Sequence, residues 1–256
     1  MSTSPARTMV TRKSAREVAA MRVAGRIVAE VLERLGRELR PGITTAQLDA
    51  VAEELIRGVG AAPSFKGYRG FPASICVSVD DEVVHGIPGP RRLREGQVVS
   101  IDAGAIWEGY HGDGARTFAL GEVAGPAHRL IETTRAALRA GIAAARPGNR
   151  IGDISAAVED VARAGGFGIV RQYVGHGIGQ RMHEEPQVPN FRQDGKGMEL
   201  QPGLCLAIEP MLTLGSHEVE VRPDGWTVVT RDGLPAAHFE ETIVVTENGP
   251  EVLTRC

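Results

Sequence analysis

Two short stretches, 107 residues apart, decide the fold that this sequence predicts. Residues 96–102 are Gly-Gln-Val-Val-Ser-Ile-Asp, and residues 203–209 are Gly-Leu-Cys-Leu-Ala-Ile-Glu. Each consists of a glycine, a short apolar run typical of a β-strand, and one carboxylate. Strands this apolar are usually buried on both faces, where a carboxylate is costly unless it is paired, hydrogen-bonded or bound to a metal. The pattern therefore predicts two buried strands, each of which ends on a carboxylate with a functional role.

The elements around these stretches also repeat with nearly the same offset. Capping boxes, helical spacing of apolar residues and Pro-Gly stops predict two helices before each apolar strand. The predicted helices run from Ser14 to Pro41-Gly42, from Thr44 to Gly58, over 127–145 and over 153–164. An offset near 106 residues is too long for a solenoid and favours an internal duplication. The alternative is that helix, Pro-Gly, helix and strand recur in many α/β proteins without duplication.

The composition excludes several classes of protein. The chain has 256 residues, of which 42% are hydrophobic, and 29 basic against 32 acidic side chains give a net charge of −3. The chain is therefore not mainly disordered, and it lacks the basic character of a nucleic-acid-binding protein. Cys76, Cys205 and Cys256 are far apart and form no disulfide pattern, which suits a reducing compartment. No apolar run approaches the length of a membrane span.

The ends of the chain complete the expected domain organisation. Residues 1–13 are polar and lack the apolar core of a secretory signal, so we expect a flexible N-terminal arm and a cytoplasmic protein. Residues 14–256 then form a single domain. Within it, the repeats cover about residues 22–120 and 128–245 and would form two α+β halves related by a pseudo-twofold axis, with a site between them.

A predicted hairpin brings two acids together. Strand-like runs at 98–101 and 115–120 flank the turn residues 107–109, and Asp113 follows Asp102 by eleven residues. In such a hairpin both carboxylates lie on one face, roughly opposite each other, where they repel unless a cation lies between them. The alternatives are a capped turn for Asp113 and a buried salt bridge for Asp102.

Further candidate residues lie in glycine-rich segments and at strand ends. His176 is bracketed by glycines, which allow the backbone to approach another group closely. Glu240 and Glu241 enter a strand, so alternation turns one of them inward. His85 and His183 are further candidates. The alternatives are an ordinary hydrogen-bonded histidine for His85 and a solvated strand residue for the inward glutamate.

Together, four carboxylates and one imidazole form an oxygen-rich set. Such a set suits Mn, Fe, Co or Zn rather than a sulfur-preferring metal. Five ligands exceed the three that are usual around one catalytic zinc, so they favour a two-metal site. His111 and His238 lie beside candidate ligands and can hydrogen-bond to them.

In order and context, these residues resemble the metal-ligand set of the methionine aminopeptidases. The motifs are Ser-Ile-Asp-Ala-Gly, His-Gly-Asp, Gly-His-Gly-Ile-Gly, Ile-Glu-Pro and Phe-Glu-Glu-Thr, and the similarity covers about residues 14–252. The resemblance implies the α+β pita-bread (creatinase/aminopeptidase) fold, in which two pseudo-twofold-related halves surround a central antiparallel sheet. The duplication inferred from the repeats agrees with this fold.

The resemblance also implies which residues hold two divalent metal ions (Co, Mn, Fe or Zn). Asp113 and Glu240 would bridge both ions. Asp102 would complete the shell of one ion, and His176 and Glu209 would complete the shell of the other.

For catalysis, the resemblance implies a bridging water or hydroxide as nucleophile and Glu209 as general base. His85 and His183 would bind the scissile amide and stabilise the tetrahedral intermediate. The positions that match the methionine pocket are Phe65, Tyr68, Phe71, Cys76, Met182 and Trp226. Phe65, Phe71 and Met182 depart from the residues most common there, which alters the shape of the pocket. The alternative for all six is plain core packing.

The spacing of the motifs resembles that of the type I, short bacterial members. His183 to Glu209 is 26 residues and Glu209 to Glu240 is 31, which leaves no place for the long helical insertion of type II. The expected activity is removal of the N-terminal methionine from nascent proteins and peptides whose second residue is small. The alternatives are a prolidase or aminopeptidase P of the same fold, a non-catalytic pita-bread binding module, and a generic two-metal esterase or phosphatase.

The expected partners are peptides and nascent chains that begin with methionine, with no membrane and no specific nucleic acid. We expect a monomer. The basic residues Arg91, Arg92 and Arg94 form either a transient ribosome contact or a solvated loop.

Overall fold

The computed structural model describes residues 10–255 of the chain. The predicted arm of residues 1–13 therefore lies mainly outside the described residues. The part that is described, residues 10–13, is held against the domain, because the buried Lys13 places its Nζ 2.7 Å from a carboxylate oxygen of Glu184. No helix in the described range combines the length and the apolar character that crossing a membrane requires.

Four helices and fifteen strands are assigned within residues 10–255. The helices are α1 (Ala15–Glu38), α2 (Thr45–Gly58), α3 (Gly125–Ala144) and α4 (Ile151–Gly165), with a short 3-10 turn η1 (Tyr68–Gly70). The strands are β1 (Ala62–Pro63), β2 (Ile75–Val79), β3 (Glu82–Val84), β4 (Val98–Trp107), β5 (Tyr110–Ala119), β6 (Gly168–Ile169), β7 (Gly175–Gly177), β8 (Glu184–Val188), β9 (Cys205–Ile208), β10 (Met211–Thr213), β11 (Val219–Val221), β12 (Val228–Thr230), β13 (Ala236–His238), β14 (Glu240–Thr246) and β15 (Gly249–Val252). All four predicted helices are confirmed.

Local capping sets the starts of α1 and α2. Ser14 and Glu17 form a reciprocal capping box at α1, and Thr44 and Gln47 form the corresponding box at α2. Pro41 cannot continue a helix, so α1 ends just before it. These signals involve residues three or four positions apart, which is why the sequence reveals them.

The large sheet has nine antiparallel strands. Its main path is β1-β4-β5-β14-β9-β7-β8, with β2 paired to β4 and β15 paired to β14. The β4–β5 hairpin turns at Glu108-Gly109, where both residues have positive φ (48° and 81°), as a two-residue turn of type I′ requires. Two smaller sheets, β13-β10-β6 and β11-β12-β3, complete the fold.

Strands β4 and β5 are longer than the sequence predicted. The prediction of 98–101 for the first was too short because Ala103, Gly104 and Ala105 lack the large side chains that mark a strand. A glycine is needed at position 104, since a Cβ added there would lie 2.7 Å from the Cβ of Ser64. Close packing against Ser64 therefore selects a small residue in the second half of β4, and the hydrophobicity pattern does not detect this part of the strand.

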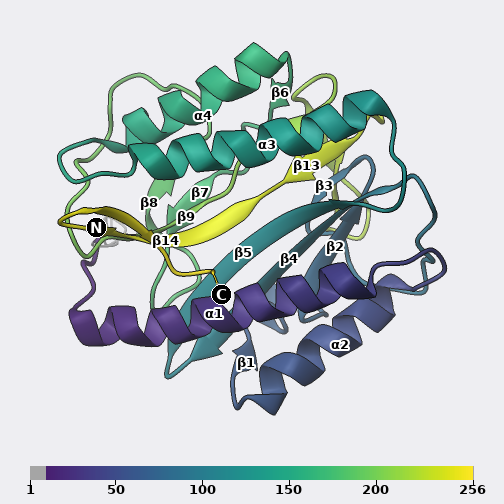
Figure 1. Ribbon diagram of the computed structural model, residues 1–256, viewed down its shortest axis with the longest axis horizontal. Helices are drawn as coiled ribbons and strands as arrows, with labels where there is room; N and C mark the ends of the chain where they lie inside the picture. Colours follow the sequence, from purple (N-terminus) through teal and green to yellow (C-terminus); the bar gives the residue numbers. More distant parts are fainter. Residues whose placement is uncertain (1–9, 256) are drawn as a thin grey trace, which may run out of the picture.

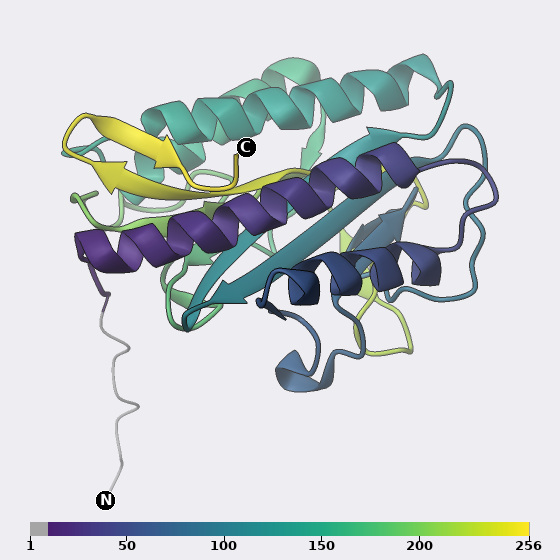
Figure 2. The ribbon, with the colours of Figure 1, turned by 60° about the horizontal axis from the view of Figure 1, so that its bottom comes forward.

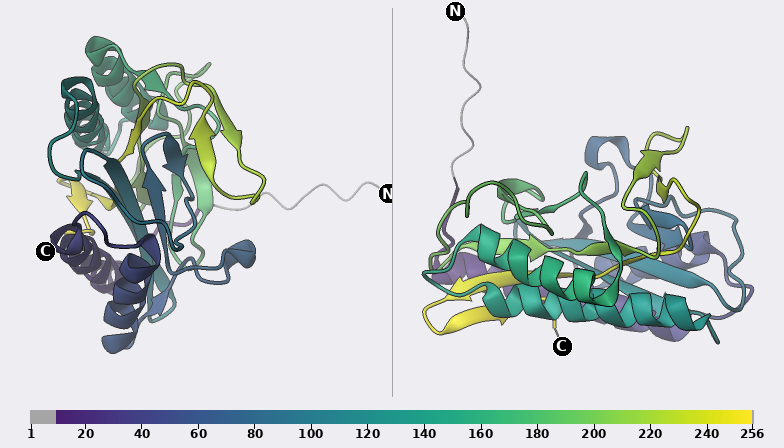
Figure 3. Two further views of the ribbon diagram at one scale, coloured as in Figure 1. Left: turned by 90° about the vertical axis from the view of Figure 1, so that its right-hand side faces the viewer. Right: turned by 90° about the horizontal axis from the view of Figure 1, so that it is seen from above.

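The helices cover one face of the large sheet, which we call the helix face; the opposite face is the cavity face (Figures 1 and 3). Helix α1 runs diagonally across β4 and β5 (Figure 2). Helices α1 and α2 enclose one apolar core with β2 and β4, and α3 and α4 enclose another with β9 and β14. The arrangement has a helix pair and a core in each half; the internal duplication itself stays a prediction.

Candidate metal centre and substrate cavity

The register of four strands puts the predicted ligands on one face of the sheet. Directly paired residues in antiparallel strands point to the same face. Asp102 on β4 and Glu240 on β14 both pair with Ala115 on β5. Asp113 pairs with Gly104, so it lies diagonally from Asp102, two positions along the strand, rather than directly opposite.

The two remaining candidate ligands, His176 and Glu209, come from strands on the other side of β14. His176 on β7 pairs with Ala207 on β9, and Ala207 pairs with Thr242 on β14. Glu209 comes two residues after Ala207 and shares its face. The five predicted ligands therefore converge from β4, β5, β7, β14 and the end of β9 on the cavity face.

The donor set fits divalent metal ions. Ligand atoms of Asp113, His176 and Glu240 all lie within 4.8 Å of one another, and so do those of Glu209, His238 and Glu240. One carboxylate oxygen each of Asp102, Asp113 and Glu240 is buried without a hydrogen-bond partner among the described residues. Buried anionic oxygens are costly unless something compensates them, and a cation is the group that three converging carboxylates would accept.

Electrostatics indicate the same need for positive charge. Burial, and next the Asp113 carboxylate, raise the pKa of Asp102 well above its usual range. Burial raises the pKa of Asp113 to about 7. For Glu209 and Glu240, burial followed by neighbouring carboxylates raises the pKa well above the ordinary value. Such crowded carboxylates are stable as anions only beside a cation.

His238 is a candidate ligand that the sequence analysis placed only beside the site. It is 2% exposed, its Nε2 has no hydrogen-bond partner within residues 10–255, and this atom lies 3.8 Å from Glu209 and 3.9 Å from Glu240. His111 is different, because its Nδ1 lies 2.9 Å from the Ser64 hydroxyl and it is absent from the cavity lining.

One cavity of about 390 Å³ opens onto this centre. Its lining contains the five predicted ligands, the histidines His85 and His183, and all six predicted pocket residues. His85 follows β3 and has φ of +60°. The next residue is glycine because a Cβ at Gly86 would lie 2.2 Å from the carbonyl oxygen of Val77.

Aromatic and polar contacts orient both histidines. The Tyr68 hydroxyl lies 2.9 Å from Nδ1 of His183, and the two rings stack with centroids 5.4 Å apart. His85 meets Tyr173 edge-on at 5.5 Å. Burial lowers the pKa of His85 to about 4, with a smaller effect from His183. Its imidazole is therefore neutral at pH 7 and can donate a hydrogen bond into the cavity.

The predicted pocket residues form one apolar cluster next to the carboxylates. The cluster contains Phe65, Tyr68, Phe71, Ala73, Cys76, Ile87, Met182 and Trp226. Phe71 and Trp226 meet edge-to-face at 5.1 Å. Cys76 pairs with Asp102 across β2 and β4, which places the pocket directly beside the metal centre.

Several lining residues were missed by the sequence analysis. Arg69, Gln172, Tyr173, Val174 and Gln187 line the cavity, and Ile87 packs against the apolar cluster. Arg69, Gln172 and Gln187 belong to no ligand-type or glycine-rich motif, so no local signal identifies them. Tyr173, which opens the segment leading to His176, could have been found from its nearness to that motif.

Comparisons with known proteins give consistent results. Residues 19–247 match the model of a family described as metallopeptidase family M24. The methionine aminopeptidase of Clostridium acetobutylicum is 50% identical over 97% of this chain and 100% of its own length. Methionine aminopeptidase 1 of Bacillus subtilis is 50% identical over 96% of this chain and 100% of its own length.

Solved structures agree with this family match. The crystal structure of methionine aminopeptidase from Thermotoga maritima has a TM-score of 0.95 and 41% identity, covering 97% of this chain and 100% of that one. The prolidase from Pyrococcus furiosus is more distant, with a TM-score of 0.78, 22% identity and coverage of 96% of this chain but 65% of that one. These likenesses confirm the predicted pita-bread fold.

Proposed function

We propose that this chain, which belongs to metallopeptidase family M24, removes methionine from the N-terminus of peptides and nascent proteins whose second residue is small. It is a metallo-exopeptidase of the methionine aminopeptidase type, as its full-length relatives at 50% identity indicate. The observation that carries the proposal is the contact between a buried carboxylate centre and an apolar cavity wall, seen where Cys76 pairs with Asp102. A flexible thioether suits a pocket of aromatic and sulfur atoms.

The prolidase alternative has less support. The prolidase from Pyrococcus furiosus is 22% identical, against 41% for the Thermotoga maritima methionine aminopeptidase. A non-catalytic binding module is also disfavoured, because the ligand-type side chains and both cavity histidines are present together.

Two divalent ions would be held by the five residues that line the centre. These residues are Asp102, Asp113, His176, Glu209 and Glu240. The orphaned oxygens of Asp102, Asp113 and Glu240 support cation binding at these residues. When bound, such ions supply Lewis acidity toward water and toward the scissile carbonyl.

The chain's own residues supply proton transfer and positioning. Glu209 lies at the end of β9, with its carboxylate 3.5 Å from His176 and 3.8 Å from His238, and it faces the cavity. This position suits a general base that accepts a proton from the attacking water and passes it to the leaving amine.

His85 and His183 would bind the scissile amide. Both line the cavity, where Tyr68 contacts the ring of His183 and Tyr173 contacts the ring of His85. Neutral imidazoles held in this way can donate hydrogen bonds to the developing oxyanion. The apolar cluster of Phe65, Phe71 and Met182 would take the methionine side chain and exclude water from it.

The test is a peptide assay with added Co, Mn, Fe or Zn. We expect methionine release from Met-Ala-Ser, little from Met-Leu-Ser, and none from Ala-Pro. Cleavage of Ala-Pro alone would favour the prolidase alternative. Hydrolysis of only p-nitrophenyl phosphate or an ester would favour a generic two-metal hydrolase and overturn the proposal.

For partners, we propose a monomer of the cytoplasm that contacts the ribosome transiently. Within the predicted basic stretch, Arg91 donates to Glu82 at 2.9 Å and Arg92 donates to the carbonyl of Gly42 at 2.8 Å. Because these two arginines serve internal contacts, the stretch is a poor candidate for docking.

A cleft on the helix face is a better candidate for the ribosome contact. It lies between α1 and α3, has a volume of about 820 Å³, and is lined by Arg116, Arg135, Arg139 and Arg255 against Glu33 and Glu241. Arg135 donates to Glu132 at 2.9 Å, so Arg116, Arg139 and Arg255 are the guanidinium groups that suit ribosomal RNA phosphates. Docking there would leave the cavity, on the opposite face of the sheet, open to a nascent chain.

Sedimentation tests this proposal. We expect the 27.3 kDa chain to be monomeric alone and to co-sediment with purified ribosomes at low salt but not at high salt. Arg139→Glu should abolish co-sedimentation, whereas Arg94→Glu should not. The reverse result would place the contact on the basic stretch.

A further inference from the structure

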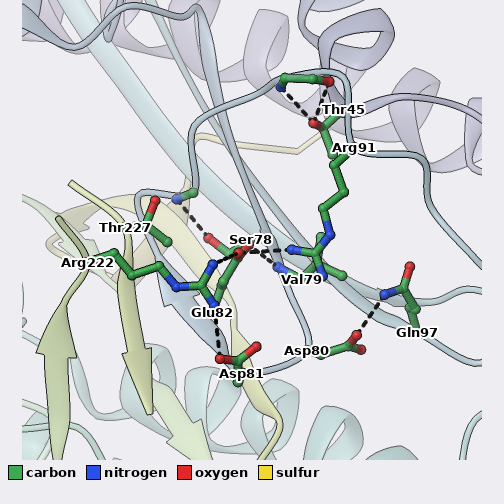
Figure 4. Close-up of polar contacts among 12 residues, drawn as sticks. Thr45, Ser78, Val79, Asp80, Asp81, Glu82, Arg91, Gln97, Arg222 and Thr227 are labelled. Atoms are coloured by element: carbon green, nitrogen blue, oxygen red, sulfur yellow. Dashed lines mark hydrogen bonds and ion pairs between the residues drawn. The ribbon is translucent and has the colours of Figure 1, made fainter. Parts of the chain in front are cut away.

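The buried carboxylate of Glu82 links strand β3 to the β11–β12 hairpin, and both elements lead to residues that line the cavity. Glu82 begins β3, which leads directly to His85, and β3 pairs with β12 of the β11–β12 hairpin. The turn of that hairpin carries Trp226. Glu82 lies between the guanidinium groups of Arg91 and Arg222 (Figure 4).

Both oxygens of the Glu82 carboxylate are used. Oε2 accepts a hydrogen bond from the backbone N–H of Val79 at 2.9 Å. Oε1 accepts from Nη1 of Arg91 and from Nη1 of Arg222, each at 2.9 Å. The other end of the Arg222 fork, Nη2, donates to Asp81 at 3.1 Å. Glu82 is only 6% exposed, so solvent screens these contacts weakly.

The turn that follows Arg222 is internally braced. The N–H of Arg222 donates to the carbonyl of Thr227 at 2.8 Å. Asp224 accepts from the backbone N–H groups of Trp226 and Thr227, both at 2.9 Å, and from the Thr227 hydroxyl at 2.6 Å. A turn held this firmly moves as one piece, so the anchor at Arg222 governs where Trp226 lies.

Trp226 forms a wall of the cavity. Its ring meets Phe71 edge-to-face at 5.1 Å and His85 at 6.3 Å. A displaced turn would therefore change the width of the pocket between Trp226 and Phe71 while leaving the metal-binding residues on the sheet in place.

We infer that Glu82, acting through Arg222, positions Trp226 and thereby sets which N-terminal side chain the pocket accepts. The inference rests on the proposed function, because it takes this pocket to hold the methionine side chain. Glu82 and Arg222 are positioning residues, and neither lines the cavity. Loss of Arg222 would leave the buried Glu82 carboxylate with one guanidinium group instead of two, and loss of Glu82 would remove the acceptor that Arg91 and Arg222 share; either change favours a shift of the turn.

The molecule contains a matched control pair in its other half. Glu159 is 4% exposed and accepts from Arg163, from Arg192 and from the backbone N–H of Arg192. Arg192 also donates to the neighbouring Asp160, as Arg222 does to Asp81. The side chains of Arg222 and Arg192 are 41% and 50% exposed. This second network lies away from the pocket lining.

The experiment compares Arg222→Met with Arg192→Met in the full-length, metal-supplemented enzyme. We expect Arg222→Met to raise KM for Met-Ala-Ser about tenfold with kcat nearly unchanged, as expected for a disturbed hydrophobic pocket. It should also change the preference between methionine and norleucine at the first position. Arg192→Met should change neither the KM nor this preference. The KM of Arg222→Lys should stay close to the wild-type value.

A fluorescence readout keeps this test independent of activity. The chain has two tryptophans, so Trp107→Phe leaves Trp226 as the sole reporter. In that background, Arg222→Met and Glu82→Gln should shift Trp226 emission to longer wavelength, and Arg192→Met should not. Unchanged KM and unchanged emission in Arg222→Met would overturn the inference. If the wild type released no methionine, the proposed function would fail, whereas the emission shift would still test the link from Glu82 to Trp226.

Discussion

Asp102 and Glu240 lie on either side of Ala115, each in direct register with it, so two metal-type carboxylates flank a single methyl group. Asp102 comes from β4 and Glu240 from β14, strands that belong to different halves of the chain. Ala115 is 1% exposed. The candidate centre therefore lies across the boundary between the halves, and each half alone holds an incomplete ligand set.

Adjacent glutamates should differ sharply in their effect on metal binding. Glu240 points to the cavity face, whereas Glu241 points to the helix face, where it accepts a hydrogen bond from Thr254. We expect Glu240→Gln to lower the metal content measured by atomic absorption, and Glu241→Gln to retain it. Equal metal content in the two variants would contradict the assignment of Glu240 as a ligand.

Metal binding should stabilise the fold. The unpartnered oxygens of Asp102, Asp113 and Glu240 are compensated when cations bind the native state. At a free metal concentration of one hundred times Kd, the free energy of unfolding should rise by about 2.7 kcal/mol. Thermal denaturation with and without EDTA measures this. A melting temperature that does not respond to chelation would argue against a metal centre.

Replacing the proposed base should separate chemistry from folding. Glu209→Gln keeps the size of the side chain, so the melting temperature measured in EDTA should stay close to wild type, while kcat of the metal-supplemented enzyme should fall by about 10²–10⁴-fold. The matched control is Glu220→Gln, which changes an exposed glutamate on β11. Wild-type turnover in Glu209→Gln would refute its role as base.

His85 should affect activity without affecting metal content. It lines the cavity but belongs to neither group of close ligand atoms. His85→Ala should lower kcat by about 10²–10³-fold, as loss of an oxyanion donor does. His128→Ala serves as control, since His128 lies on α3 outside the cavity lining. Loss of metal from His85→Ala would instead make His85 a ligand.

The capping box of α1 should make stability depend on pH. Hydrogen bonds from the backbone and side chain of Ser14, and next from Tyr110, lower the pKa of Glu17 to about 2. A depressed folded-state pKa means that this stabilisation is present above pH 4.5 and is lost as the pH falls toward 2. Glu17→Gln should therefore lower the free energy of unfolding by about 0.3–1 kcal/mol at pH 7 and by much less at pH 2.

Helix α2 provides the comparison for this prediction, because its capping box uses the uncharged Gln47. Gln47→Ala should destabilise the protein equally at both pH values. Urea unfolding curves at pH 7 and pH 2 measure both variants. A pH-independent effect of Glu17→Gln would show that its charge contributes nothing.

Much of the fold could be predicted because its signals are local. Capping boxes at Ser14 and Thr44 involve residues three positions apart, and they located two helix starts correctly. The glycine–apolar–acid stretches ending at Asp102 and Glu209 likewise marked buried strands without knowledge of their neighbours. The ends of strands were harder to predict. Position 104 in β4 requires a glycine because Ser64, forty residues away in the chain, packs against it.

The sequence therefore determined the helices, the order of the candidate ligands and the oxygen-rich character of the centre, because these depend on neighbouring residues and on side-chain chemistry. Only the tertiary structure decided how those groups meet. The alignment of Glu240 with Asp102 across Ala115, the approach of His238 to Glu209 and the link from Glu82 to Arg222 all depend on strand register and loop packing between distant segments. Register is set by hydrogen bonds between segments that are distant in the chain, so neighbouring residues do not encode it.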